Sequence, residues 1–293
     1  MSLQSLFRLL LLSALWGGTF LLMRIATPIL GPSFTVEARV LTAAIFLLFV
    51  SIYLKKEINC LKSYKHFLIL GLFNSALPSF LFSYASLSLS ASELSILNAT
   101  SPVFGFIIGV LIGNEKINFK RVLGLFIGIF GVVVLFSDSD FSQNTNSALS
   151  ILCGLFAAFC YGVATNYAKK SITVEPLLNA YGSMVFSSII IFPSLFFVLP
   201  TSEPTPEVIL AVLALGVLCS GIAYLLYFRL IKDVGATTAL TVTFLIPIFS
   251  AFWGYLFLGE TITQNIVFGM SIVLIGTGLV SGFDFLSFIK NKR

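Results

Sequence analysis

The side chains that could bind a ligand are scattered through a very apolar chain. The candidates are hydroxyl, amide and aromatic side chains: Trp16, Asn74, Tyr84, Asn98, Ser101, Tyr161, Tyr224 and Thr241. Such groups suit a small polar or zwitterionic molecule that also has an apolar part. For any single serine or threonine, the more ordinary role is a hydrogen bond between helices. Asn98 and Trp16 are therefore the stronger candidates for a binding site.

Two prolines lie inside apolar stretches that otherwise suit long helices. We expect Pro102 and Pro247 in the middle of their helices, where a proline removes a backbone hydrogen bond and kinks the helix. A kink opens space and frees a carbonyl group for a polar neighbour or a ligand. The alternative is a static bend that serves packing alone. Because both copies of a repeated sequence keep the proline, we favour a paired role in shaping a cavity.

The sequence lacks the motifs of enzymes and metal sites. It contains no HExxH, GxSxG or phosphate-binding loop. Its one histidine, His66, lies beside Lys62 and Lys65, where contact with solvent or lipid headgroups is expected. The four cysteines have no CxxC spacing and are expected to be buried thiols. We therefore expect no enzyme activity, no bound metal and no cofactor.

The composition indicates a protein of the lipid bilayer. Of the 293 residues, 58% are hydrophobic and only 10% charged, and the mean hydropathy is +1.04. A soluble domain carries about a quarter of its residues as charged side chains. The net charge of +5 does not indicate nucleic-acid binding, because the basic residues lie in short loops rather than in one patch.

The chain repeats itself at a constant offset of 145 positions. The matching pairs include Gly17 and Gly162, Ala91 and Ala236, Pro102 and Pro247, Glu115 and Glu260, Gly124 and Gly269, and Gly131 and Gly276. Each half also contains five apolar runs near the ~20 residues that cross a bilayer. The ten expected transmembrane helices are 6–25, 34–54, 67–88, 91–112, 120–137, 148–168, 176–199, 207–230, 235–258 and 264–283.

The lysines and arginines set the expected orientation of these helices. With the N-terminus in the cytoplasm, all of the 17 except Arg24 and Arg39 fall on the cytoplasmic side. Five spans per half is an odd number, so the second half must cross the membrane in the opposite sense. We therefore expect two inverted repeats at 1–137 and 148–285, an external linker at 138–147 and a basic cytoplasmic tail at 286–293. Both termini are expected in the cytoplasm.

Inverted repeats are typical of alternating-access transporters, whose site lies between the two halves near the bilayer midplane. The alternative is a duplicated membrane protein that moves nothing. Without a nucleotide-binding motif, the free energy for transport must come from a gradient or from exchange.

Short motifs in both halves resemble the EamA-type members of the drug/metabolite transporter superfamily. They are Ala14-Leu15-Trp16-Gly17, Glu37-Ala38-Arg39, Ala99-Thr100-Ser101-Pro102-Val103-Phe104, Gly113-Asn114-Glu115-Lys116, Gly128-Ile129-Phe130-Gly131-Val132-Val133, and Pro247 with Leu258-Gly259-Glu260. The resemblance covers residues 6–283, and it departs only at Gly113-Asn114-Glu115, where the usual form is Leu-Gly-Glu. It implies a ten-helix carrier, and many members export amino acids or other small metabolites.

We therefore expect a secondary-active transporter in the cell inner or plasma membrane, an exporter or exchanger of small organic metabolites such as amino acids. One alternative is an uptake carrier for a nucleotide-like or cofactor-like solute. Another is a membrane scaffold that kept the fold but transports nothing.

Charged side chains within spans need an explanation, since each costs at least ~2.5–3.5 kcal/mol at the bilayer centre. Glu37, Arg39 and Glu93 fall near the outer ends of expected helices, and we interpret them as a gate or selectivity ring. The alternative is solvation at helix ends with snorkelling arginines, which applies well to Arg24. Coupling to protons would require Glu37 or Glu93.

Small residues recur every four positions along two of the expected helices. Gly105, Gly109 and Gly113 do so on one, and Gly124 and Gly128 on the next. Small residues let helix backbones approach closely in lipid. Packing within one chain is the first interpretation, and a homodimer through the fifth or tenth helix is left open.

Overall fold

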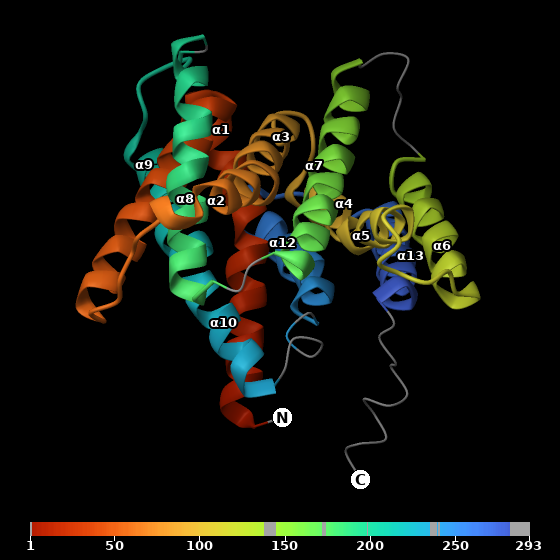
Figure 1. Cartoon of the computed structure of the whole chain (residues 1–293). Coiled ribbons are helices and arrows are strands. Elements are labelled where there is room, and N and C mark those ends of the chain that lie inside the picture. The colour runs from red at the N-terminus through yellow and green to blue at the C-terminus, as the bar shows by residue number, and fades with distance from the viewer. Residues whose placement is uncertain are drawn as a thin grey trace.

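The computed structural model describes residues 2–137, 145–171, 174–197, 199–234, 239 and 241–281, and within these ranges the chain is helical without a β-strand. The elements are α1 (Leu3–Tyr53), η1 (Leu61–Ser63), α2 (Tyr64–Leu70), η2 (Gly71–Ala76), α3 (Leu77–Ala85), α4 (Ala91–Asn98), α5 (Ser101–Leu111), α6 (Phe119–Leu135), α7 (Thr145–Lys170), α8 (Pro176–Ile191), η3 (Phe192–Phe196), α9 (Pro206–Gly216), η4 (Val217–Ile222), α10 (Ala223–Val234), α12 (Val242–Leu258) and α13 (Gln264–Ser281) (Figure 1).

Seven helical segments of the described chain are long and apolar enough to cross a membrane. They are Leu3–Tyr53, Leu61–Ala85, Ala91–Leu111, Asn146–Lys169, Pro176–Phe196, Pro206–Val234 and Gln264–Ser281, and α12 is a shorter apolar helix. The expectation of an all-helical, multi-pass membrane protein is confirmed at this level.

The first two expected helices, 6–25 and 34–54, are two arms of α1 that meet at Gly31. This residue has φ 74° and ψ 164°, a conformation that L side chains rarely adopt and that glycine permits. Pro28 and Pro32 flank it and remove two backbone donors from the helical ladder. The chain therefore turns back without a loop, and the red first arm and orange second arm diverge from this point (Figure 1).

Two segments have π-helical geometry that the apolar runs did not predict. They are η2 and η4, and they occupy corresponding places in the two halves, since 71–76 shifted by 145 gives 216–221. A π turn holds an extra residue and changes the direction in which side chains point, and it is found frequently at functional sites.

The helix expected at 91–112 is broken in the structure. Ala99 and Thr100 form a turn between α4 and α5, and Pro102 lies in the first turn of α5. The expectation of a mid-helix position for Pro102 was therefore wrong. The first turn of a helix tolerates a residue without an N–H group, since the N–H groups there have no partner within the helix. Pro247 does lie inside its helix, α12.

The boundary between the two halves also differs from the expectation. Helix α7 begins at Thr145, so the last three residues of the expected linker 138–147 are helical. Residues 138–144 and the expected tail at 286–293 lie outside the described residues.

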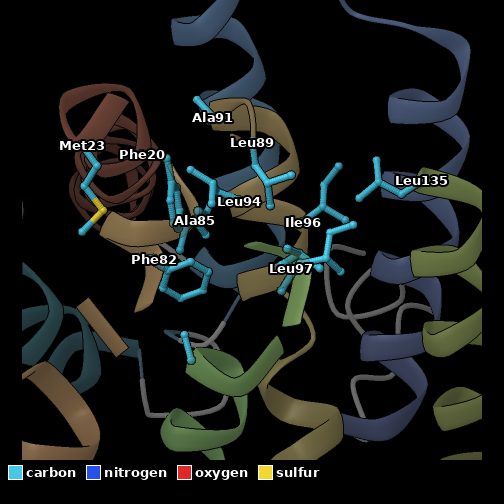
Figure 2. Packing of buried hydrophobic residues seen from close by; sticks show 14 of the residues in the cluster. Phe20, Met23, Phe82, Ala85, Leu89, Ala91, Leu94, Ile96, Leu97 and Leu135 are labelled. Atoms are coloured by element: carbon cyan, nitrogen blue, oxygen red, sulfur yellow. The ribbon is translucent and has the colours of Figure 1, made fainter. Parts of the chain in front are cut away.

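The largest group of buried apolar side chains joins both halves of the chain. Phe20 and Met23 of α1 lie on one side of Leu94 and Leu97 of α4, and Leu135 at the end of α6 lies on the other side (Figure 2). Further members come from α7, α12 and α13. This packing brings α4 against α1 and α12, so the two halves form one body.

Residues 145 positions apart make corresponding close contacts. A Cβ added to Gly17 would lie 2.8 Å from Cβ of Phe249, and one added to Gly162 would lie 3.1 Å from Cβ of Phe104. The first contact joins α1 to α12 and the second joins α7 to α5. Only glycine permits such an approach at either site.

The same correspondence holds where α6 crosses α13, which lie side by side (Figure 1). A Cβ on Gly124 would meet the carbonyl oxygen of Gly276 at 2.7 Å. A Cβ on Gly269 would meet the carbonyl oxygen of Gly131 at 3.1 Å. The glycine spacing found in the sequence therefore serves packing within one chain at these positions.

Candidate functional site

Polar and aromatic side chains from both halves meet around Arg39. The Nε of Arg39 donates a hydrogen bond to Oγ of Ser220 at 3.0 Å. Nδ2 of Asn74 donates to the hydroxyl oxygen of Tyr224 at 3.1 Å. The Trp16 ring meets the Tyr224 ring edge-on, with 6.4 Å between centroids. Four expected site residues, Trp16, Arg39, Asn74 and Tyr224, thus lie together.

Tyr161 of α7 belongs to the same group. Tyr161 and Trp16 pack against the same group of buried apolar side chains, which contains Phe82. The Tyr161 ring also stacks on Phe82 of α3, with centroids 6.3 Å apart. We call this group the Arg39 cluster; it consists of Trp16, Arg39, Asn74, Tyr161, Ser220 and Tyr224.

The two π segments present the polar atoms of the cluster. Asn74 lies in η2 and Ser220 lies in η4, while Tyr224 follows one turn later on α10. Gly216, just before η4, lies so close to the backbone oxygen of Arg39 that a Cβ there would lie 2.8 Å from it. This approach holds the second arm of α1 against η4, and it brings Arg39 to Ser220.

Arg39 has no carboxylate within 4 Å among the residues that the structure describes. A cation in a bilayer without an anion is costly, and its usual partners are other charges or backbone carbonyls. Here its neighbours are hydroxyl groups and aromatic rings. Chemically, the cluster can accept an anionic group such as a carboxylate, because a guanidinium offers several donors in a planar fork.

The expected site residues on the fourth helix make local contacts instead. Oγ of Ser101 donates to the carbonyl oxygen of Asn98 at 2.6 Å, which is the carbonyl that Pro102 leaves without its helical donor. The next carbonyl, that of Ala99, accepts from Oγ1 of Thr277 at 2.8 Å. Hydroxyl groups of the protein itself thus satisfy the carbonyls at this break.

The two remaining candidates come from other parts of the chain. Tyr84 is half-buried on α3, and Thr241 is half-buried at the start of α12.

The charges expected to form a gate have separate partners. Glu93 accepts from the backbone N and Oγ of Ser90, both at 2.8 Å, and closes a capping box at the start of α4. Glu37 accepts from Oγ of Ser188 on α8 at 2.5 Å. Arg24 lies 3.4 Å from the carboxylate of Glu260 and does not extend freely to the membrane surface.

His66 is not at a solvated edge, so that expectation was wrong. Its side chain is only 5% exposed, and its Nε2 lies 3.0 Å from Oδ1 of Asn179 on α8. Its ring also packs against that of Tyr167. The prediction relied on the neighbouring lysines, which indicate that the helix end is near water. They do not indicate which way the His66 side chain points, because that depends on the helix packed beside it.

Glutamates close ion pairs at two corresponding places. Oε1 of Glu115 lies 2.8 Å from Nζ of Lys169, and Oε2 lies 2.6 Å from Arg121. Hydrogen bonds from Lys169, and then from Arg121, lower the pKa of the Glu115 carboxyl group. Glu260 pairs with Arg24 and also accepts from the backbone N of Ala91 at 2.9 and 3.0 Å. We call these the Glu115 pair and the Glu260 pair.

Two surface pockets lie away from the Arg39 cluster. One of about 380 Å³ is next to the Glu260 pair and is lined by Ser90, Glu93, Leu135, Glu260, Thr261, Thr263, Asn265 and Ile266. The other, about 280 Å³, is lined by Glu57, Asn59, Lys62, Ser63, Val174, Glu175 and Leu178.

Sequence reasoning missed Ser220, because a single serine in an apolar helix does not stand out from the pattern around it. The repeat contained the signal, because Ser220 stands 145 positions after Ser75 of η2. It also missed Phe82, since an aromatic residue in an apolar run is indistinguishable from ordinary core.

Comparison with known proteins gives the family. The model of the EamA-like transporter family matches residues 4–137 and 148–282. The chain belongs to this family. YoaV, an uncharacterized transporter of Bacillus subtilis (strain 168), is 25% identical over 267 residues, which cover 89% of this EamA-like chain and 91% of YoaV. Protein PagO of Salmonella typhimurium is 27% identical over 243 residues, 82% of this chain and 80% of PagO.

A more distant relative and a solved structure extend the likeness. The WAT1-related chloroplastic protein At3g02690 of Arabidopsis thaliana is 24% identical over 283 residues, 91% of the EamA-like chain and 66% of the relative. A solved crystal structure with 15% identity superposes with a TM-score of 0.67 over 100% of both chains, which shows a shared fold. The family and its relatives identify the EamA-like chain as a membrane transporter, consistent with the expectation that it is not an enzyme.

Proposed function

We propose that the chain is a secondary carrier that moves small organic metabolites such as amino acids out of the cell by alternating access. The observation that carries this proposal is the Arg39 cluster, where elements of both halves meet. Within the described part of the chain, its cation has hydroxyl groups and aromatic rings around it and no carboxylate beside it. The cell inner or plasma membrane is its proposed location.

The two halves, 1–137 and 148–285, are proposed to be inverted five-helix repeats with both termini in the cytoplasm. The corresponding contacts of Gly17 and Gly162, and of Gly124 and Gly269, support this arrangement. The matched positions of η2 and η4 support it as well. Two related halves can exchange their conformations, so that a site between them opens first to one side and then to the other.

In the proposed complex, the carboxylate of an amino acid lies on the guanidinium of Arg39. The hydroxyl group of Tyr161 is a further donor for this anion, whereas the hydroxyl proton of Ser220 goes to the carbonyl oxygen of Leu215. The ammonium group can lie over the face of Trp16 or Tyr224, where cation–π attraction contributes about 0.5–2 kcal/mol. The same aromatic surface accepts the apolar part of the metabolite.

The Glu115 pair and the Glu260 pair are proposed to hold the two ends of the carrier closed. Each joins elements that are distant in sequence: Glu115 binds Lys169 of α7, while Glu260 binds Arg24 of α1 and the N-terminus of α4. Alternating access then requires one pair to open while the other stays closed.

Counterflow in proteoliposomes tests the proposed function. Vesicles with purified protein are loaded with unlabelled amino acids, and entry of each labelled amino acid is measured. We expect saturable uptake that accelerates with internal substrate, and its loss in Arg39→Gln. Arg229→Gln is the matched control, because Arg229 is exposed and pairs with Asp233 in its own helix. If no amino acid or other labelled metabolite enters faster than into empty vesicles, the carrier proposal fails.

A further inference from the structure

Glu37 is a buried carboxyl group with one unsatisfied oxygen. Its side chain lies on the second arm of α1 and the residue is 7% exposed. Oε1 accepts a hydrogen bond from Oγ of Ser188 at 2.5 Å, while Oε2 is buried without a hydrogen-bond partner among the residues that the structure describes. The position 145 residues later is Gly182, so the second half has no corresponding carboxyl group.

The other well-placed carboxylates of the described chain have donors or cations. Glu93 is held by the backbone and hydroxyl of Ser90. Glu115 has two cations, and Glu260 has Arg24 and a backbone N–H. The remaining ones are exposed or ion-paired: Glu57, Glu175, Glu203, Glu207 and Asp233. The sequence suggested Glu37 and Glu93 for proton coupling. Because Glu93 is held by Ser90, Glu37 is the remaining candidate.

No charged group from the neighbouring elements compensates Glu37. Arg39, two residues along α1, points to Ser220 of η4. On the elements packed against this arm, Glu175 caps α8, Cys219 donates to the carbonyl oxygen of Leu15, Tyr224 accepts from Asn74, and Arg229 pairs with Asp233. The other titratable side chains there are the exposed Glu207 and Lys232 and the half-buried Tyr84, Tyr181 and Tyr227. Among the described residues, Ser188 alone makes a polar contact with Glu37.

This environment suits the neutral acid better than the carboxylate. An ionised carboxylate in the membrane interior requires cations or donors at both oxygens. A protonated carboxyl needs fewer, because one oxygen carries the proton and the other accepts from a single hydroxyl. The packing of α1 against α8 seen here is therefore favoured when Glu37 carries a proton.

We propose that Glu37 is the proton-binding site that couples this carrier to the proton gradient, with Ser188 as its positioning residue. The proposal rests on the proposed transport function. In export, Glu37 takes a proton from the outer side when the carrier is open there, and releases it inside when the arm of α1 leaves α8. One proton enters for each metabolite that leaves, and no covalent bond is involved.

The arm that holds Glu37 also holds Arg39, which gives coupling a physical route. Ser187, next to Ser188, donates to the carbonyl oxygen of Gly71 at 2.9 Å. Gly71 begins η2, which presents Asn74 to the Arg39 cluster. A change in how the second arm of α1 packs on α8 therefore alters the surroundings of Glu37 and the position of the Arg39 cluster together.

Labelling with dicyclohexylcarbodiimide tests the proton site without knowledge of the substrate. This apolar reagent adds to protonated carboxyl groups buried in a membrane, and the adduct rearranges to a stable N-acylurea with no atom released. The purified protein in vesicles is labelled across a pH series, and peptides are mapped by mass spectrometry. We expect label at Glu37, falling about tenfold for each pH unit once the group ionises. Glu93 and Glu115 are internal controls that should remain unlabelled.

The outcomes are distinct from those of the transport assay. Absence of label on Glu37 in wild-type protein, at the lowest pH that keeps it folded, overturns the proton site even if counterflow is active. Wild-type vesicles without counterflow overturn the transport function and the coupling that rests on it, while label on Glu37 still identifies a buried carboxyl group that binds a proton. Where counterflow is present, Glu37→Gln should keep amino-acid exchange but lose uptake driven by a pH gradient, and Ser188→Ala should shift the pH dependence of that uptake. An unchanged pH-driven rate in folded Glu37→Gln also overturns the proposal.

Discussion

Glu115 pairs with Lys169 at 2.8 Å, and the residues 145 positions away, Glu260 and Arg24, form the second such pair at 3.4 Å. The partners exchange order, since the glutamate comes first in one pair and the cation first in the other. Each pair therefore joins the first half of the chain to the second. The two glutamates differ in their additional partners. Glu115 has a second cation, Arg121, whereas Glu260 accepts from the backbone N–H at the N-terminus of α4.

Opening one pair should admit reagents from one side only. Cys219 is a native probe for this, because it is buried beside the Arg39 cluster. With the other cysteines replaced by serine, Glu260→Gln should raise labelling of Cys219 by an impermeant maleimide in intact cells. Glu115→Gln should raise it in inverted vesicles. Equal effects of both variants from one side would contradict the assignment of the pairs to opposite ends.

Arg39 should need its fork of donors as well as its charge. Arg39→Lys keeps the cation but loses planar, two-pronged contact with a carboxylate. A hydrogen bond to a charged group contributes about 1.5–3 kcal/mol, so we expect the half-saturation concentration in counterflow to rise about 10–100-fold. Tyr224→Phe removes only the partner of Asn74 and should have a smaller effect. Wild-type affinity in Arg39→Lys would argue against direct contact with the substrate.

Gly17 and Gly18 form a matched pair for the packing of α1 on α12. A Cβ on Gly17 would lie 2.8 Å from Cβ of Phe249, whereas one on Gly18 finds its nearest atom 3.8 Å away, on Trp253. Gly17→Ala should therefore lower the free energy of unfolding by ~1–3 kcal/mol through overpacking. Gly18→Ala should be neutral or stabilising, because alanine favours helix. Thermal unfolding in detergent measures both, and equal midpoints would contradict the close contact.

The Glu115 pair should weaken in acid. Its cations lower the pKa of the Glu115 carboxyl group below the ordinary value of 4.5. The pair therefore stabilises the folded chain above that value, and the contribution is lost as the pH falls through the lowered pKa. Glu115→Gln should melt earlier than wild type at neutral pH, and the difference should shrink in acid. A difference that is constant with pH would show that the carboxylate charge is not responsible.

The positions of seven long apolar helical segments could be predicted from the sequence, because hydropathy reports directly which segments avoid water. The shape within them could not. Gly31 turns α1 back within a single residue, so the apolar pattern shows a short gap where the structure has none. The π geometry of η2 and η4 leaves no hydropathy signal, since an added residue changes direction and not polarity.

The candidate site was predicted in part for a related reason. Trp16, Asn74 and Tyr224 stood out as polar or aromatic residues in apolar helices, and they do meet. Arg39 was placed near an outer helix end by counting along the chain. Eight residues of helix beyond Gly31 correspond to about 12 Å of depth, at 1.5 Å per residue. Which side chains face one another at that depth depends on how η4 packs, and one sequence does not specify this.

The most direct test of the account is the side of the membrane on which two corresponding loops lie. Ile117 and Ile262 are exposed, stand 145 positions apart, and follow Glu115 and Glu260 respectively. Ile117→Cys and Ile262→Cys are made singly in a chain whose native cysteines are serine, and intact cells are treated with an impermeant maleimide. Inverted halves predict that Ile262→Cys is labelled in intact cells and Ile117→Cys only after permeabilisation. Labelling of both from the same side would contradict the inverted arrangement.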